Sequence, residues 1–124
     1  MKRVVLIGLL SISIISAETF TDKRTGLMWQ DTSSSEMSYK EAEGYCANLK
    51  LDGFKDWHLP TIDELKSIVD YTKRPALIKG FKHRDTNWYW TSTKGGSASF
   101  WVVDFGSGLD GWRNASSFVR CVRQ

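Results

Sequence analysis

Cysteine, proline and histidine are all scarce in this sequence, with two of each among 124 residues. With two histidines and no His-x-x-x-His spacing, nothing in the sequence indicates a zinc site. With no Cys-x-x-Cys pair, nothing indicates a dithiol redox centre. The charges are nearly balanced, with 17 Lys and Arg against 14 Asp and Glu. Tryptophan is abundant, with six residues, so we expect one compact, aromatic-rich domain and not a disordered chain.

The chain has a single long apolar run, from Val4 to Ile15, which is too short for a confident transmembrane helix. Basic residues precede this run, and Ser16 and Ala17 follow it, which is the pattern of a secretory signal peptide. We expect residues 1–17 to be removed and residues 18–124 to form a single domain that is periplasmic, secreted or at the cell surface. The residue directly after Ala17 is Glu18 and not a cysteine, so no lipid anchor is indicated. We therefore expect no stable membrane anchor after the signal is removed.

Basic residues of the expected mature chain are scattered among nearly as many acids. Nucleic-acid binding requires a clustered basic stripe, so we exclude nucleic acid as a partner.

The two cysteines are expected to form one disulfide, because exported proteins meet an oxidising environment. Cys46 and Cys121 would close a loop whose chain-entropy stabilisation is roughly 4–5 kcal/mol at most. Two separate buried thiols are the alternative, and it is weaker outside the cytosol.

The first half of the chain predicts a hairpin and two helices. Thr19–Thr21 and Leu27–Gln30 read as strands around a turn that contains Gly26. Ser38 with Glu41, and Thr61 with Glu64, form the serine or threonine plus glutamate pattern of a capping box, so a helix should follow each. The second helix is expected to carry Leu65, Ile68 and Val69.

The second half predicts a long irregular loop over residues 72–87 and then strands. The expected strands are 88–93, 99–105 and 118–123, with glycine-rich turns over 94–97 and 106–111. Alternation along the last strand places Val119 and Cys121 on one face and Arg120 and Val122 on the other. Helices beside a mainly antiparallel sheet make an α+β domain.

Five motifs, in this order, resemble those of one bacterial family. They are Thr25-Gly26-Leu27-Met28-Trp29-Gln30, Ala42-x-x-Tyr45-Cys46-x-x-Leu49, Gly53-x-x-Asp56-Trp57-His58-Leu59-Pro60-Thr61-x-x-Glu64-Leu65, Tyr89-Trp90-Thr91-Ser92-Thr93 and Val119-Arg120-Cys121-Val122-Arg123. The chain resembles a domain-of-unknown-function family whose named member is the C-terminal domain of the Legionella collagen-like adhesin.

That resemblance implies a C-type-lectin-like fold, which is related to the formylglycine-generating enzymes. The implied architecture has two helices packed on a small, mainly antiparallel sheet, with a long loop region. His58 departs from the family, which usually has Arg at this position. A salt bridge made there by Arg would be made by His58 only when the imidazole is protonated.

The motifs give no sign of catalysis, so we expect a protein that is not an enzyme and has no metal or cofactor. Formylglycine generation needs two cysteines at an open copper site, whereas the two here are expected to be joined. No Gly-x-Ser-x-Gly turn is present. Sugar-binding C-type lectins carry Glu-Pro-Asn or Gln-Pro-Asp, followed by Trp-Asn-Asp, around calcium, and this chain has neither.

Aromatic and polar residues gather in the last third of the chain, and we predict a ligand-binding surface there. The predicted site residues are Trp88, Trp90, Asp110, Trp112, Arg113 and Asn114. The last four fall in or beside a glycine-rich stretch, 106–114, that is expected to be a loop. Trp88 and Trp90 could equally be core residues.

A glycan or a cell-envelope or surface protein is the expected ligand of such a site. A structural or interaction subunit of an envelope assembly is the alternative function. A weaker hypothesis gathers basic residues into a surface for sulfated glycans, as in the named adhesin relative. Its members are Lys79, Lys82, His83, Arg84, Arg120 and Arg123.

Overall fold

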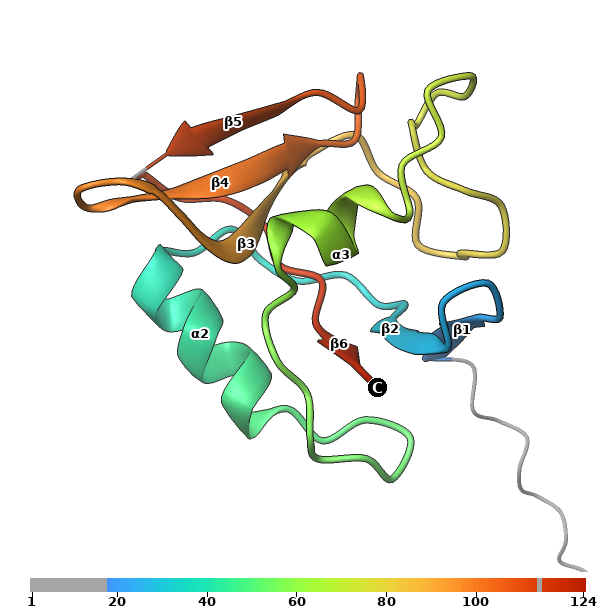
Figure 1. Ribbon diagram of the computed structural model, residues 1–124. Coiled ribbons are helices and arrows are strands. Elements are labelled where there is room, and N and C mark those ends of the chain that lie inside the picture. Colours follow the sequence, from blue (N-terminus) through green and yellow to red (C-terminus); the bar gives the residue numbers. More distant parts are fainter. Residues whose placement is uncertain (1–17, 114) are drawn as a thin grey trace, which may run out of the picture.

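The computed structural model describes residues 18–113 and 115–124 (Figure 1). The predicted signal peptide, 1–17, and the predicted site residue Asn114 lie outside the described residues. Two helices and two three-stranded antiparallel sheets make up the described chain, which confirms the α+β class. The strands form two separate sheets instead of the one that was expected.

The first sheet joins the two ends of the domain in the order β1-β2-β6. Strands β1 (Thr19–Asp22) and β2 (Leu27–Gln30) form the predicted hairpin, and Gly26 adopts a φ of +77° in its turn. Strand β6 (Val122–Arg123) pairs with β2. It is shorter than the predicted 118–123 because Phe118 pairs with Tyr89 of the other sheet, so this segment crosses between the two sheets.

Helix α2 (Tyr39–Asn48) begins at the predicted capping box, in which Ser38 and Glu41 bond to each other's backbone N–H groups. The bond from the Ser38 N–H holds the pKa of Glu41 below its usual value. Ala42 and Cys46 form the buried face of the helix. The predicted disulfide between Cys46 and Cys121 is confirmed, and it ties α2 to the segment that leads into β6.

Helix α3 (Ile62–Lys66) also begins at its predicted capping box, formed by Thr61 and Glu64. The helix is shorter than expected, because Ser67 bonds back to the Glu64 carbonyl and the chain turns away. Ile68 is still buried, but it lies in this turn. The helix packs beside β3 and β4 (Figure 1).

The second sheet has the order β3-β4-β5. Strand β3 (Trp88–Gly96) continues through most of the predicted turn, and β4 (Ser99–Asp104) lies nearly where it was expected. Strand β5 (Asp110–Arg113) is a correction, because residues 106–114 were expected to be a loop. Its backbone pairs with residues 100–103 of β4, so the sheet supplies the hydrogen bonds that keep this glycine-rich segment extended.

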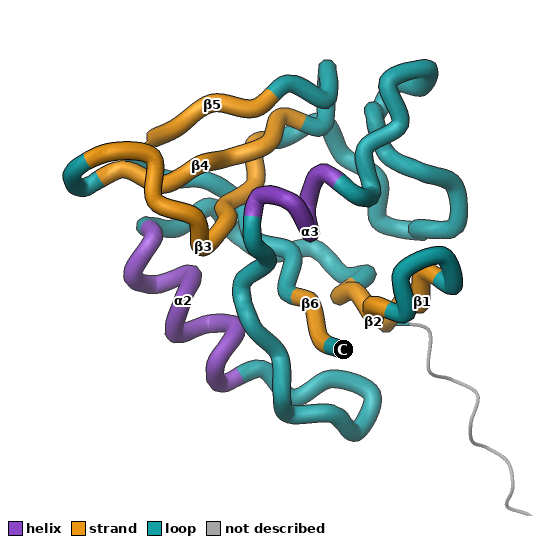
Figure 2. Tube along the Cα trace, in the orientation of Figure 1, coloured by secondary structure: helices purple, strands orange, loops and turns teal. Residues whose placement is uncertain are grey.

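The core consists of two apolar clusters, and β3 contributes to both. Tyr89 lies in the cluster with Phe81 and Leu77 from the long loop, whereas Trp90 lies in the cluster with Cys46 of α2. Both faces of β3 are therefore covered at Tyr89 and Trp90. As predicted, the loop over residues 72–87 forms neither helix nor strand (Figure 2). Its residues Leu77 and Phe81 pack on the Tyr89 side of β3.

Candidate ligand-binding surface

Trp101 and Trp112 lie opposite each other on β4 and β5 and form an edge-to-face pair. Their ring centroids are 5.2 Å apart and the ring planes meet at 88°. Trp112 remains 59% exposed, whereas Trp101 is half-buried. Gly95 of β3 leaves room for the Trp112 side chain, because a Cβ added at Gly95 would come within 2.7 Å of the Trp112 Cβ. The result is a large ring held in place but open to solvent.

An ion pair lies next to this aromatic pair on the same face of the sheet. Asp110 is two residues before Trp112 on β5, so the two side chains share a face about 7 Å apart. Lys66 of α3 donates to the Asp110 carboxylate with an Nζ–Oδ2 distance of 2.9 Å. This bond raises the pKa of Lys66 above its usual value.

Tyr71 extends this surface beyond the ion pair. Its ring packs against Gly108, where an added Cβ would come within 2.9 Å of the ring carbons. The side chain is 60% exposed. We refer to Trp101, Trp112, Asp110, Lys66 and Tyr71 together as the aromatic surface. It combines two exposed rings with a carboxylate and an ammonium group.

Trp88, Trp90 and Arg113, which were also predicted as site residues, lie on the opposite face of the sheet. Trp90 is fully buried, and its indole N–H donates to the Met37 carbonyl, so its assignment to a binding surface is wrong. Trp88 is half-buried, and the Arg113 guanidinium lies 5.0 Å from its ring centroid. The structure therefore brings Asp110 and Trp112 together and separates them from Trp88, Trp90 and Arg113.

The predicted basic cluster does not form one surface. Arg120 is 2% exposed and donates to the carbonyls of Gln30 and His83. Burial lowers its pKa, and the nearby Asp31 carboxylate opposes that effect. Arg120 is therefore an internal residue, which forms an ion pair with Asp31 and whose guanidinium closes backbone hydrogen bonds inside the domain.

The remaining basic residues point in different directions. Arg84 donates to the carbonyls of Leu77 and Ile78, so it fastens the long loop onto itself. Arg123 forms a salt bridge with Asp56. Lys79, another member of the predicted cluster, lines a cavity.

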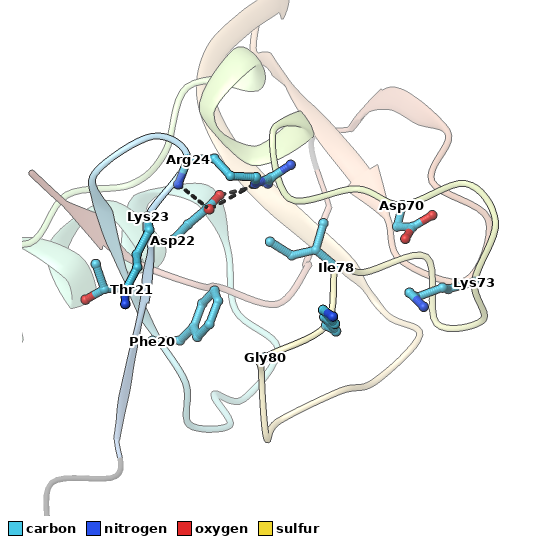
Figure 3. A pocket seen from close by; sticks show the side chains of 10 residues that line it. Phe20, Thr21, Asp22, Lys23, Arg24, Asp70, Lys73, Ile78 and Gly80 are labelled. Atoms are coloured by element: carbon cyan, nitrogen blue, oxygen red, sulfur yellow. Dashed lines mark hydrogen bonds and ion pairs between the residues drawn. The ribbon is translucent and has the colours of Figure 1, made fainter.

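That cavity lies between β1 and the loop region after α3 and has a volume of about 770 Å³ (Figure 3). Phe20 and Ile78 contribute apolar side chains to it. Its charged lining residues are Asp22, Lys23, Arg24, Asp70, Lys73 and Lys79. We refer to this cavity as the basic pocket.

His58 lies near the N-terminus of α3, where its Nε2 is 3.4 Å from the Glu64 Oε1. Glu64 is already bonded to the Thr61 N–H of the capping box. A protonated His58 would add a charge-assisted contact to this carboxylate.

The described residues form neither a metal-binding cluster nor a membrane-spanning helix. No group of three or more His, Cys, Asp or Glu within residues 18–113 and 115–124 is arranged to hold a metal ion. Neither helix of this described part is long and apolar enough to cross a membrane.

Sequence reasoning missed most of the residues around these two sites. Lys66 and Tyr71 come from segments far from β5 in the chain, and nothing in their local pattern indicates that they meet Asp110 and Gly108. Trp101 belongs to the aromatic-rich last third of the chain, and that enrichment was the sequence feature that could have indicated this residue. The basic pocket is formed by three separate segments, and no motif predicted that they would lie together.

The fold and surfaces define a small, disulfide-linked α+β domain that exposes aromatic side chains beside an ion pair. The chain belongs to the Lcl C-terminal domain family, whose model matches residues 18–123. No curated protein sequence matches the chain at a significant level.

Proposed function

We propose that this protein is an exported, non-catalytic recognition module that binds a glycan through the aromatic surface, without calcium. The single observation that carries this proposal is the Trp101–Trp112 pair, in which one ring orients the other and leaves most of it in solvent. A ring held in advance loses little conformational freedom when a ligand stacks on it.

The chemistry around the ring suits a sugar. The apolar face of a pyranose can pack on an indole, and its hydroxyl groups need hydrogen-bond partners at the rim. Asp110 can accept such bonds and Lys66 can donate them. Tyr71, which packs against Gly108 beside β5, would contact a second residue of an oligosaccharide. The proposed ligand is therefore an oligosaccharide longer than one sugar unit.

A protein partner in a cell-envelope assembly is the second candidate function. Tyr71, Leu109 and Trp112 are the large apolar or aromatic side chains that the described residues leave most exposed. Tyr and Trp are enriched at the centres of protein interfaces. A flat partner surface would cover all three side chains together.

The first experiment is a glycan-array screen of the oxidised protein with and without a calcium chelator. We expect binding that survives the chelator, is lost in Trp112→Ala and is partly kept in Trp112→Phe. Arg113→Ala is the matched control, because this residue neighbours Trp112 on β5 but projects from the other face of the sheet. Arg113→Ala should bind as the unchanged protein does.

Binding that requires calcium, or that Arg113→Ala removes while Trp112→Ala does not, would contradict the proposed site. Silence across the array would favour the protein partner. A pull-down from envelope extract, compared with the Trp112→Ala variant, would then test that alternative. The partner should be retained at a fixed stoichiometry by the unchanged protein and lost with the variant.

A further inference from the structure

The basic pocket shares no residue with the aromatic surface, and its lining combines two kinds of group (Figure 3). Its volume of about 770 Å³ lies within the range of about 300–1,000 Å³ of cavities that hold small organic ligands. The lining residues come from β1 and its turn and from the chain between Asp70 and Gly80.

The apolar part of the lining is kept partly open by a glycine. Phe20 packs against Phe81 on one side, with ring centroids 4.5 Å apart. Gly80 lies directly over the same ring and has a φ of +115°, and an added Cβ would overlap the Phe20 ring atoms. Phe20 and Ile78 both remain partly exposed in the pocket. Covering these groups with an apolar ligand would release water from them.

The charged part of the lining has an excess of cations. Asp22 is nearly buried and is held by Arg24, which donates to both of its carboxylate oxygens. Asp70 accepts from the N–H and hydroxyl groups of Thr72. These two carboxylates are therefore already satisfied within the domain.

Three ammonium groups complete the rim of the pocket. Within residues 18–113 and 115–124, no ion pair engages Lys23, Lys73 or Lys79. All three side chains are exposed. The pocket therefore offers an apolar floor below a positively charged rim.

We propose that the basic pocket binds a small amphiphilic organic anion, with a ring-sized apolar body and a phosphate or carboxylate group. The apolar body would lie against Phe20 and Ile78, and the acidic group would contact Lys73 and Lys79. A purely hydrophilic anion would leave the apolar floor uncovered, and a neutral apolar molecule would leave the lysines without a counter-charge. Both parts of the ligand are therefore needed for binding.

The test uses 1-naphthyl phosphate as the probe, with 1-naphthol and inorganic phosphate as its separate halves. Isothermal titration calorimetry on the oxidised full chain at low salt measures each affinity. We expect 1-naphthyl phosphate to bind at least about tenfold more tightly than either half, because the two contacts act on one molecule. Affinity no higher than that of inorganic phosphate would overturn the proposal.

Two double variants with equal charge changes separate the pocket from general electrostatics. Lys73→Glu with Lys79→Glu should weaken 1-naphthyl phosphate binding about tenfold, since one exposed charge contact can change affinity by up to about fivefold. Lys40→Glu with Lys50→Glu changes two exposed lysines outside the pocket and should change the affinity less than about twofold. Equal losses in the two double variants would overturn the proposal.

A readout without substitutions locates the probe directly. In an amide NMR titration, 1-naphthyl phosphate should shift the resonances of Thr21, Lys79 and Gly80. In a separate test, the Ile78→Ala substitution should weaken the binding of 1-naphthyl phosphate and of 1-naphthol, while the affinity for inorganic phosphate should stay unchanged. Resonance shifts confined to the aromatic surface around Trp112 would overturn the assignment to this pocket. The outcome is independent of the glycan screen, because that screen is designed around Trp112.

Discussion

Trp90 and Trp112 project from opposite faces of the same sheet. Trp90 pairs with Val102, and Val102 pairs with Gly111, so these three residues lie in one line across the strands. Trp112 follows Gly111 and therefore points to the other face. Trp90 fills the core below α2, whereas Trp112 stands in solvent beside Trp101. Two tryptophans that look equivalent in the sequence thus have different roles.

The first prediction concerns these two residues. Trp90→Ala should lower the free energy of unfolding by about 3–5 kcal/mol, because it leaves a cavity and frees the Met37 carbonyl. Trp112→Ala should change it by about 0.5 kcal/mol or less, since the ring is mostly exposed. Urea unfolding followed by circular dichroism gives both values. Equal losses for the two variants would mean that Trp112 is a core residue.

The second prediction concerns the disulfide. Its cysteines are 75 residues apart, so breaking it frees a long loop in the unfolded chain. Replacing both Cys46 and Cys121 by Ala should cost about 2–5 kcal/mol of unfolding free energy. The unfolding free energy of the double variant is compared with that of the unchanged protein, which is measured under both oxidising and reducing conditions. If the reductant leaves the unfolding midpoint of the unchanged protein in place, the bond does not stabilise the fold.

The third prediction concerns Arg120, whose guanidinium bonds two backbone carbonyls inside the domain. Arg120→Ala leaves these two carbonyls without their donor and the neighbouring Asp31 without its ion-pair partner, and we expect a loss of about 3–5 kcal/mol in unfolding free energy. Arg120→Lys should also be costly, because a single ammonium group cannot reproduce the guanidinium fork.

Arg123→Ala is the matched control for that experiment, since its partner Asp56 is exposed. It should cost about 1 kcal/mol or less. If Arg120→Ala were as mild as Arg123→Ala, the buried hydrogen bonds of Arg120 would not contribute to stability.

The fourth prediction concerns the acid stability of the pair formed by Asp22 and Arg24. Side-chain hydrogen bonds from Arg24 hold the pKa of Asp22 below the usual value of 3.8. A carboxyl group with a lowered pKa in the folded state stabilises the protein above the unfolded value, and this contribution is lost as the pH falls below it. Asp22→Asn should therefore reduce the unfolding free energy at pH 7 and leave it nearly unchanged at the lowest pH values.

The expected size of this effect is about 1 kcal/mol at pH 7, because Arg24 is largely exposed and solvent screens the pair. Urea unfolding of both proteins between pH 2 and pH 7 measures the difference. A difference that stays constant over this range would show that the ionisation of Asp22 is not its source.

Local sequence patterns predicted where the helices begin and where the hairpin turns. Both capping boxes involve residues three positions apart, and the hairpin depends on the backbone freedom of Gly26. Such features need only neighbouring residues, so they can be read directly from the chain. Strand β5 could not be read in this way, because its hydrogen bonds come from β4 and its own residues resemble those of a turn.

The candidate site was predictable only in part. The aromatic enrichment indicated the last third of the chain, and among the described residues Trp112 is the most exposed tryptophan there. Which tryptophan is exposed depends on what covers each face of the sheet, and those covers come from α2, α3 and the long loop. The partnership of Asp110 with Lys66 depends on the same packing.

The sequence by itself determined the family, the helix starts and the pairing of Cys46 with Cys121, because a local pattern or the scarcity of cysteine left few alternatives. The tertiary structure alone decided that Arg120 is buried, that Trp90 and Trp112 have opposite environments, and that Lys73 and Lys79 share a pocket. Burial and contact between distant segments are properties of the packed chain. Those segments come together only when their apolar surfaces leave water. The sequence of one segment does not show which distant segment will pack against it.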